Sequence, residues 1–195
     1  MEKVRIRHQP LADKHEILGA PSDRSVAVLL FHVSEQKGLE RFEPRPIDGS
    51  SEPCVWAVDD DRLRNYLVPR DCPRVTYYAD AKTSRADADH FLGRARAILA
   101  FEHDWLDRVR SVHLFCYELP AAGFDLVDAV AGYYVSRTAV EPLSVRVIGD
   151  CLGELARRGV DVRILPNLWP LHDAVTRSTL AYSMIRMRNA APRPA

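Results

Sequence analysis

The sequence predicts a single α+β domain built on a mainly antiparallel β-sheet with a few short flanking helices. Three observations support this prediction. Short apolar runs of strand length recur along the 195 residues, most connections between them are of hairpin length, and few stretches have helical periodicity. A chain of this length can bury roughly 70% of the surface that its unfolded form exposes, so we expect a substantial core.

The ends of the chain differ in composition from its centre. Residues 1–24 are polar and include Pro10 and the Gly-Ala-Pro-Ser punctuation at 19–22, which predicts an N-terminal arm. The domain is expected over residues 25–188, and a basic, proline-containing tail over 189–195.

The strands are predicted from the apolar runs. The first run, VAVLLFHV, is apolar almost throughout, which is typical of a strand covered on both faces. The run VHLFCYEL instead alternates between its two sides. In chain order, the predicted strands are residues 26–33, 54–58, 74–79, 98–101, 112–119, 133–136, 143–148 and 160–165.

Three helices are expected from capping and periodicity. The acidic run at 59–61 caps a short helix that Pro69 stops, and Asp150 caps a helix that ends at Gly159. Pro170 suits the first turn of a third helix, which we expect to cover the sheet or to form a homodimer face. Its apolar stripe consists of Leu171, Val175, Leu180, Met184 and Met187.

Composition excludes several classes of protein. Lysine plus arginine and aspartate plus glutamate each number 27, so a global electrostatic attraction to nucleic acid or anionic lipid is not expected. No apolar run approaches the length of a membrane span, and the mixed charges of the first thirty residues argue against a signal peptide. The four scattered cysteines favour reduced, packed thiols. We therefore predict a cytoplasmic protein without nucleic-acid or membrane partners.

The common catalytic signatures are absent from the sequence. There is no P-loop, no G-x-G-x-x-G after a strand, no H-E-x-x-H, no G-x-S-x-G and no EF-hand loop. The seven histidines lack metal-ligand spacing, so no metal site is predicted.

The candidate site combines aromatic, cationic and acidic residues. His32 ends the first apolar run, and Trp56 lies on the next predicted strand. Arg45 and Arg70 lie in the proline-flanked segments FEPRP and PR, and acidic residues follow strand 112–119. This combination is what a charged dinucleotide requires. The alternative is that His32 is a packed strand-end histidine and that Trp56 belongs to the core.

Several segments carry a resemblance to known enzymes. In order, these are LLFHVS, the FEPRP loop, CVWAVDDD, LFCYELPAAGFDLVD and YYVSRTAVEPLSVRVIGD. Over residues 29–165 they resemble the rifampin ADP-ribosyltransferases and their superfamily. The chain also resembles an uncharacterised bacterial family of similar length, through F-H-x-S-E, VPRDCPR at 68–74 and PNLWPL at 166–171. The first resemblance implies an ADP-ribosyltransferase-like split sheet and an NAD⁺-dependent transfer of ADP-ribose to an unidentified acceptor.

The resemblance also implies roles for residues of the first two strands. His32 matches the histidine that hydrogen-bonds the adenosine-side ribose of NAD⁺, a contact that suits imidazole because it both donates and accepts. Trp56 stands where the family usually has a tyrosine that packs against nicotinamide. Ser34 is also expected to contact the cofactor, and Arg45 or Arg70 would hold the pyrophosphate.

The acidic position of the family falls on Asp128, with Asp125 and Glu141 as rivals. A carboxylate there would stabilise the positive charge that develops on the ribose as nicotinamide leaves. Arg137 is the expected salt-bridge partner of one of these acids. The sequence departs from the family in two places, since no glycine follows His32 and tryptophan replaces tyrosine at position 56.

Three other functions are considered. The same fold could serve as a non-catalytic nucleotide- or partner-binding domain, or carry an RNA 2′-phosphotransferase-like activity. An unrelated enzyme with Cys54 or Cys116 as nucleophile is the third, although no histidine stands at an evident partnering position.

Overall fold

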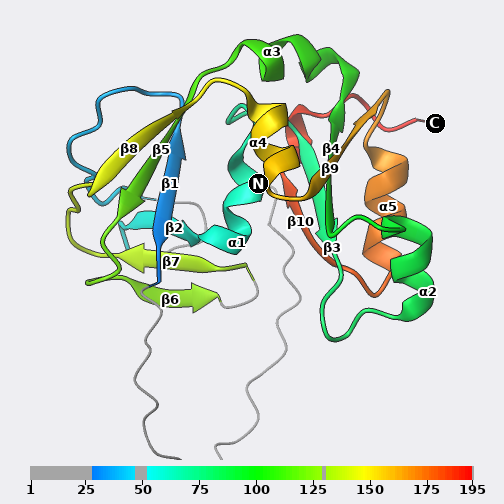
Figure 1. The fold of residues 1–195 in the computed structure, drawn as a ribbon, viewed down its shortest axis with the longest axis horizontal. Helices are drawn as coiled ribbons and strands as arrows, with labels where there is room; N and C mark the ends of the chain where they lie inside the picture. Colours follow the sequence, from blue (N-terminus) through cyan, green and yellow to red (C-terminus); the bar gives the residue numbers. More distant parts are fainter. Residues whose placement is uncertain (1–27, 47–51, 129–130, 195) are drawn as a thin grey trace, which may run out of the picture.

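The computed structural model describes residues 28–46, 52–128 and 131–194 and has an α+β fold with two β-sheets and short helices (Figure 1). The arm predicted over residues 1–24 lies outside the described residues. All eight predicted strands are present, with bounds that shift by a few residues, and two further strands, β6 (Asp125–Asp128) and β10 (Ala181–Ile185), were not predicted.

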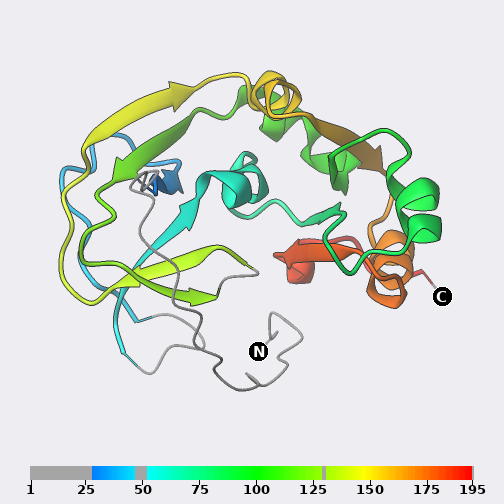
Figure 2. The same cartoon turned by 60° about the horizontal axis from the view of Figure 1, so that its bottom comes forward.

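The larger sheet has six strands in the order β6-β7-β2-β1-β5-β8, and every neighbouring pair is antiparallel. The sheet curves around α1 (Asp60–Leu63), which lies on its concave side (Figure 2). β1 is central and is held between β2 and β5. The strands are β1 (Leu30–Ser34), β2 (Val55–Asp59), β5 (Leu114–Leu119), β6 (Asp125–Asp128), β7 (Tyr133–Ser136) and β8 (Ser144–Ile148).

The smaller sheet has four strands in the order β10-β3-β4-β9. Its β4–β9 pair is parallel and its other two pairs are antiparallel, so the predicted mainly antiparallel pairing is confirmed. The strands are β3 (Arg74–Tyr78), β4 (Ala97–Glu102), β9 (Val160–Leu165) and β10 (Ala181–Ile185).

The helices are short, as predicted. Asp59 caps α1 by accepting from the Arg62 amide, and Asp150 caps α4 by accepting from the Gly153 amide, both at 2.8 Å. None of the described helices is long and apolar enough to cross a membrane. The helical segments are α1 (Asp60–Leu63), η1 (Arg64–Tyr66), α2 (Arg85–Asp87), η2 (Ala88–Leu92), η3 (His103–Trp105), α3 (Leu106–Ser111), α4 (Cys151–Arg157), α5 (Trp169–Arg177) and η4 (Met187–Asn189).

The core consists of three apolar clusters that follow the two sheets. The largest lies between the sheets and joins residues such as Val58 and Leu114 of the large sheet to Leu99 of the small one. A second cluster, around Tyr77, lies under α5 on the outer face of the small sheet. The third, around Tyr117, lies on the opposite face of the large sheet. The large sheet is therefore covered on both faces over its central strands.

The prediction of one helix over residues 170–187 is wrong. α5 ends at Arg177, and residues 181–185 form β10, which pairs with β3. Leu180 and Met184 have the four-residue spacing of one face of a helix, but together with Tyr182 they also have the two-residue spacing of one face of a strand. The edge of β3 offers backbone hydrogen-bond partners to this segment, and pairing with them favours the strand. The residues of the predicted apolar stripe pack in the core cluster around Tyr77. They therefore do not form the exposed apolar face on which the predicted homodimer was based.

Candidate functional site

The candidate site lies where two strands of the large sheet separate. β1 pairs with β2 only at Leu30–Asp59 and Phe31–Val58, although β1 stays paired with β5 as far as Ser34. The His32 ring lies at this separation, with Nδ1 2.9 Å from the Trp56 carbonyl oxygen. Because a carbonyl can only accept, Nδ1 carries the proton, and Nε2 of the neutral ring is an acceptor.

The surroundings of His32 favour its neutral form. Burial lowers the pKa of His32, the hydrogen bond to the Trp56 carbonyl opposes this, and the positive charges of Arg70 and Arg45 lower it further. The ring also contacts Phe42, with 4.9 Å between ring centroids. The imidazole is therefore uncharged at neutral pH, and it makes no other hydrogen bond to the described residues.

Backbone hydrogen bonds hold the segments that carry the two arginines near His32. Arg45 exchanges both backbone hydrogen bonds with Cys54, just before β2. The Arg70 amide donates to Glu35 Oε1 at 2.8 Å, just after β1. Both arginines are exposed, and within the described chain neither guanidinium forms an ion pair. Their positive charges are thus available to an anion.

Ser34 is the last residue of β1 and, by strand alternation, lies on the same face as His32. Its hydroxyl oxygen accepts from the Gln36 amide at 3.0 Å. This bond forms the turn that leads the chain away from the sheet.

Trp56 lies on the opposite face of the sheet from His32. The pairing of Phe31 with Val58 puts Trp56 and Val58 on the face away from His32. The side chains of His32 and Trp56 therefore do not line the same pocket, although the His32 ring bonds the Trp56 backbone carbonyl. The indole meets Tyr133 edge-on at 5.0 Å, and the hydroxyls of Tyr133 and Tyr66 are 2.9 Å apart. The Trp56 Nε1 is buried, without a hydrogen-bond partner among the described residues.

Asp125 and Asp128 share the Trp56 face of the sheet by their pairing with β7, whereas Glu141 does not. Asp128 belongs to β6, opposite Tyr133 and on the Trp56 face, and its Oδ1 accepts from the Ala131 amide at 2.8 Å. Asp125 forms the predicted ion pair with Arg137, at 3.0 Å.

Glu141 lies on the His32 side of the sheet. It follows Val140, whose backbone bonds that of Phe42, and its side chain is paired with Arg41 at 3.4 Å. No candidate acid is therefore placed beside both His32 and Trp56.

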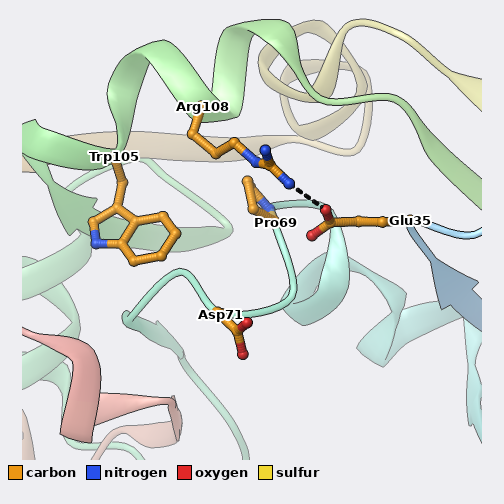
Figure 3. Close-up of a pocket in the computed structure, with 5 residues that line it drawn as sticks. All are labelled: Glu35, Pro69, Asp71, Trp105 and Arg108. Carbon is orange, nitrogen blue, oxygen red and sulfur yellow. Dashed lines mark hydrogen bonds and ion pairs between the residues drawn. The ribbon is translucent and has the colours of Figure 1, made fainter.

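Sequence reasoning missed a cavity beside the end of β1. It has a volume of about 330 Å³ and is lined by Glu35, Pro69, Asp71, Trp105 and Arg108 (Figure 3). Three of these residues belong to the F-H-x-S-E and VPRDCPR segments, so these two motifs could have indicated the cavity from the sequence. The other two come from η3 and α3, which were not predicted.

The cysteines do not form a nucleophilic site. All four are buried and none forms a disulfide, and burial raises the pKa of Cys116 to about 11 and that of Cys72 to about 12. Across residues 28–46, 52–128 and 131–194, no group of three or more histidine, cysteine, aspartate or glutamate side chains could hold a metal ion.

Comparison with known proteins identifies a family. Residues 31–190 match DUF6886, a family of unknown function, and the chain belongs to this family. No curated protein and no solved structure matches the chain.

Proposed function

We propose that the protein is an NAD⁺-dependent transferase that moves ADP-ribose to an acceptor, and that its two sheets form an ADP-ribosyltransferase-like split fold. The observation that carries the proposal is the neutral His32 ring near two exposed arginines, both of which act on its pKa. Its Nε2 can accept a ribose hydroxyl proton, while Arg45 and Arg70 can hold a diphosphate through charge-assisted bonds. The order of motifs along the chain, described above, supports the same assignment.

The second half of the proposed site is the Trp56 face; because it lies on the other side of the sheet from His32, one NAD⁺ would have to pass the end of the β1–β2 pairing to contact both. The indole would pack against the nicotinamide ring, and its unpartnered Nε1 would donate to the carboxamide oxygen. Asp128 is the proposed acidic residue because it lies opposite Tyr133, which contacts the indole, whereas Asp125 on the same face is ion-paired with Arg137.

The reaction exchanges one bond for another at the ribose. The bond from ribose C1′ to nicotinamide nitrogen breaks, and nicotinamide leaves with the electron pair. The acceptor nucleophile then bonds to C1′ and releases its proton to solvent. The Asp128 carboxylate would stabilise the oxocarbenium charge between these events.

Calorimetric titration of NAD⁺, together with a nicotinamide-release assay, tests the proposal. We expect binding by the wild type and a loss of about tenfold or more in affinity for His32→Ala and for the double change Arg45→Gln, Arg70→Gln. Arg94→Gln, a change of an exposed arginine outside the site, is the control and should bind normally.

The outcomes separate the alternatives. Binding with release that depends on His32 and Asp128 supports the transferase. Binding without release from NAD⁺, even with acceptors supplied, would favour a non-catalytic nucleotide-binding domain. Absence of NAD⁺ binding by the wild type would overturn the proposal.

A further inference from the structure

β8 is the edge strand of the large sheet, at the end opposite β6. Its single partner strand within the described residues is β5, so the backbone N–H and C=O groups on its other side are not paired with a strand there. Figure 2 shows β8 along the outer border of the sheet. The large sheet therefore ends in an edge that a further strand can extend.

The side chains of this edge are apolar on one face of the sheet. Leu143, Val145 and Val147 alternate along the strand and are 66%, 52% and 59% exposed. Val145 lies opposite Tyr117, a member of the apolar cluster on the outer side of the large sheet. The exposed row therefore continues this cluster as far as the edge.

The usual protection of an edge strand is missing on this face. Natural edge strands are commonly protected by charged side chains, by proline or by a bulge. β8 pairs with β5 over five consecutive residues without a bulge, and Pro142 precedes the strand. Arg146, the charged residue of β8, lies on the other face, where it bonds Glu154 at 2.7 Å. The apolar row is thus open to pairing.

The edge is complementary to itself in one antiparallel register. When two copies pair with Val145 at the centre, Leu143 of each copy lies opposite Val147 of the other, and Ser144 lies opposite Arg146. All the apolar side chains of the row then face apolar side chains. A register centred on Arg146 would instead place two arginines opposite each other, which is unfavourable.

The charges on the inner face favour the same register. Ser144 lies opposite Glu118 of β5, and its hydroxyl donates to Glu118 Oε2 at 3.1 Å. Among the residues that the structure describes, the Glu118 carboxylate has no ion-pair partner. Arg146 of a second copy would extend this row from the other side of Ser144, so the register brings unlike charges toward each other twice, once on each side of the axis.

We propose that β8 is the interface of a homodimer, in which two copies pair antiparallel about a two-fold axis at Val145 and join their large sheets into one. Because this axis is perpendicular to the sheet, both copies present the same face to the same side. His32 lies opposite Tyr117, which lies opposite Val145, so the two His32 residues would share one row across the axis. Five strand spacings separate them, roughly 24 Å.

Sedimentation equilibrium of the full chain, between about 5 and 500 µM, tests this inference. A strand of five residues with three apolar side chains buries less than the roughly 1,200 Å² at which standard interfaces begin, so we expect a monomer–dimer equilibrium with a Kd on the order of 10–100 µM. Val145→Lys and Val145→Glu each put two like charges across the axis and should weaken the dimer at least about tenfold.

A mixture of Val145→Lys and Val145→Glu should form the dimer again, because residue 145 of one copy faces residue 145 of the other only in the proposed register. Val127→Lys is the matched control, since Val127 is 50% exposed on β6 at the opposite edge of the same sheet. It should dimerise like the wild type. Circular dichroism checks that all three variants fold as the wild type does.

Three results would overturn the inference. The first is a wild type that stays monomeric at 500 µM, which would leave the edge to a strand from another protein or from elsewhere in this chain. The second is a loss in Val127→Lys equal to that in Val145→Lys. The third is a lysine–glutamate mixture that does not dimerise although the wild type does. The measurement contains no NAD⁺, so the dimer and the proposed transferase can fail separately.

Discussion

Glu154 and His32 are both buried or largely buried titratable groups near arginines, but the protein uses those arginines differently. Glu154 is 8% exposed and bonds Arg146, Arg157 and Arg158 at 2.7, 3.1 and 3.2 Å. Burial opposes ionisation, yet the three arginines outweigh it and lower the pKa of Glu154 to about 2.

The arginines near His32 have no such partner among the residues that the structure describes. Arg45 and Arg70 are exposed, and they act on a ring that is neutral and cannot neutralise them. The arginines at α4 are paired with carboxylates of the protein, which stabilises the fold. The guanidinium groups of Arg45 and Arg70 are instead available to a ligand. The difference identifies the second region as the candidate site.

The largest expected effect is on the Glu154 network. Glu154→Ala leaves three arginines close together without their carboxylate, and we expect a loss of about 2–3 kcal/mol in the free energy of unfolding, since the arginines can partly move into water. Urea denaturation measures this. The exposed pair of Glu43 with Arg41 is the control, and Glu43→Ala should cost less than about 1 kcal/mol. Equal losses in the two variants would contradict the assignment of a stabilising network.

The pH dependence of stability separates the two regions. The folded pKa of Glu154 is below the ordinary 4.5, so its contribution is present above pH 4.5 and is lost as the pH falls toward about 2. The folded pKa of His32 is below the ordinary 6.5, so acidification from pH 6.5 downward protonates the unfolded chain first and destabilises the fold.

Denaturation series at several pH values check both windows. Glu154→Gln should flatten the profile below pH 4.5 and leave the higher window unchanged, whereas His32→Gln should flatten it just below pH 6.5. A His32→Gln profile that is parallel to that of the wild type would contradict the lowered pKa of His32.

The smallest stability effect is expected at the exposed arginines. Arg45→Gln and Arg70→Gln should each change the free energy of unfolding by no more than about 0.5 kcal/mol, because within the described residues neither guanidinium is ion-paired. Each should raise the pKa of His32, as followed by NMR titration of its ring protons. Arg158→Gln, by contrast, removes bonds to Glu154 and Asp60 and should destabilise the protein more than either. A reversed order would remove the distinction between the two regions.

The sequence determined the strands that carry the site and the caps of two helices. Continuous apolar runs predicted β1 and β2, so His32 and Trp56 were correctly expected on neighbouring strands, and acidic residues predicted the caps at Asp59 and Asp150. These features depend on local pattern and on backbone groups within a few residues, which a single sequence displays.

Only the tertiary structure decided which side of the sheet each site residue occupies and what residues 181–185 become. A shift of one residue in pairing exchanges the two faces of a strand. The sequence of neither strand alone predicts that β1 separates from β2 after two residue pairs. The segment after α5 suits helix and strand equally by its apolar spacing, and hydrogen bonding to β3 selected the strand. The cavity at Trp105 likewise exists because η3 and α3 pack beside the end of β1, a contact between segments about seventy residues apart that local pattern does not predict.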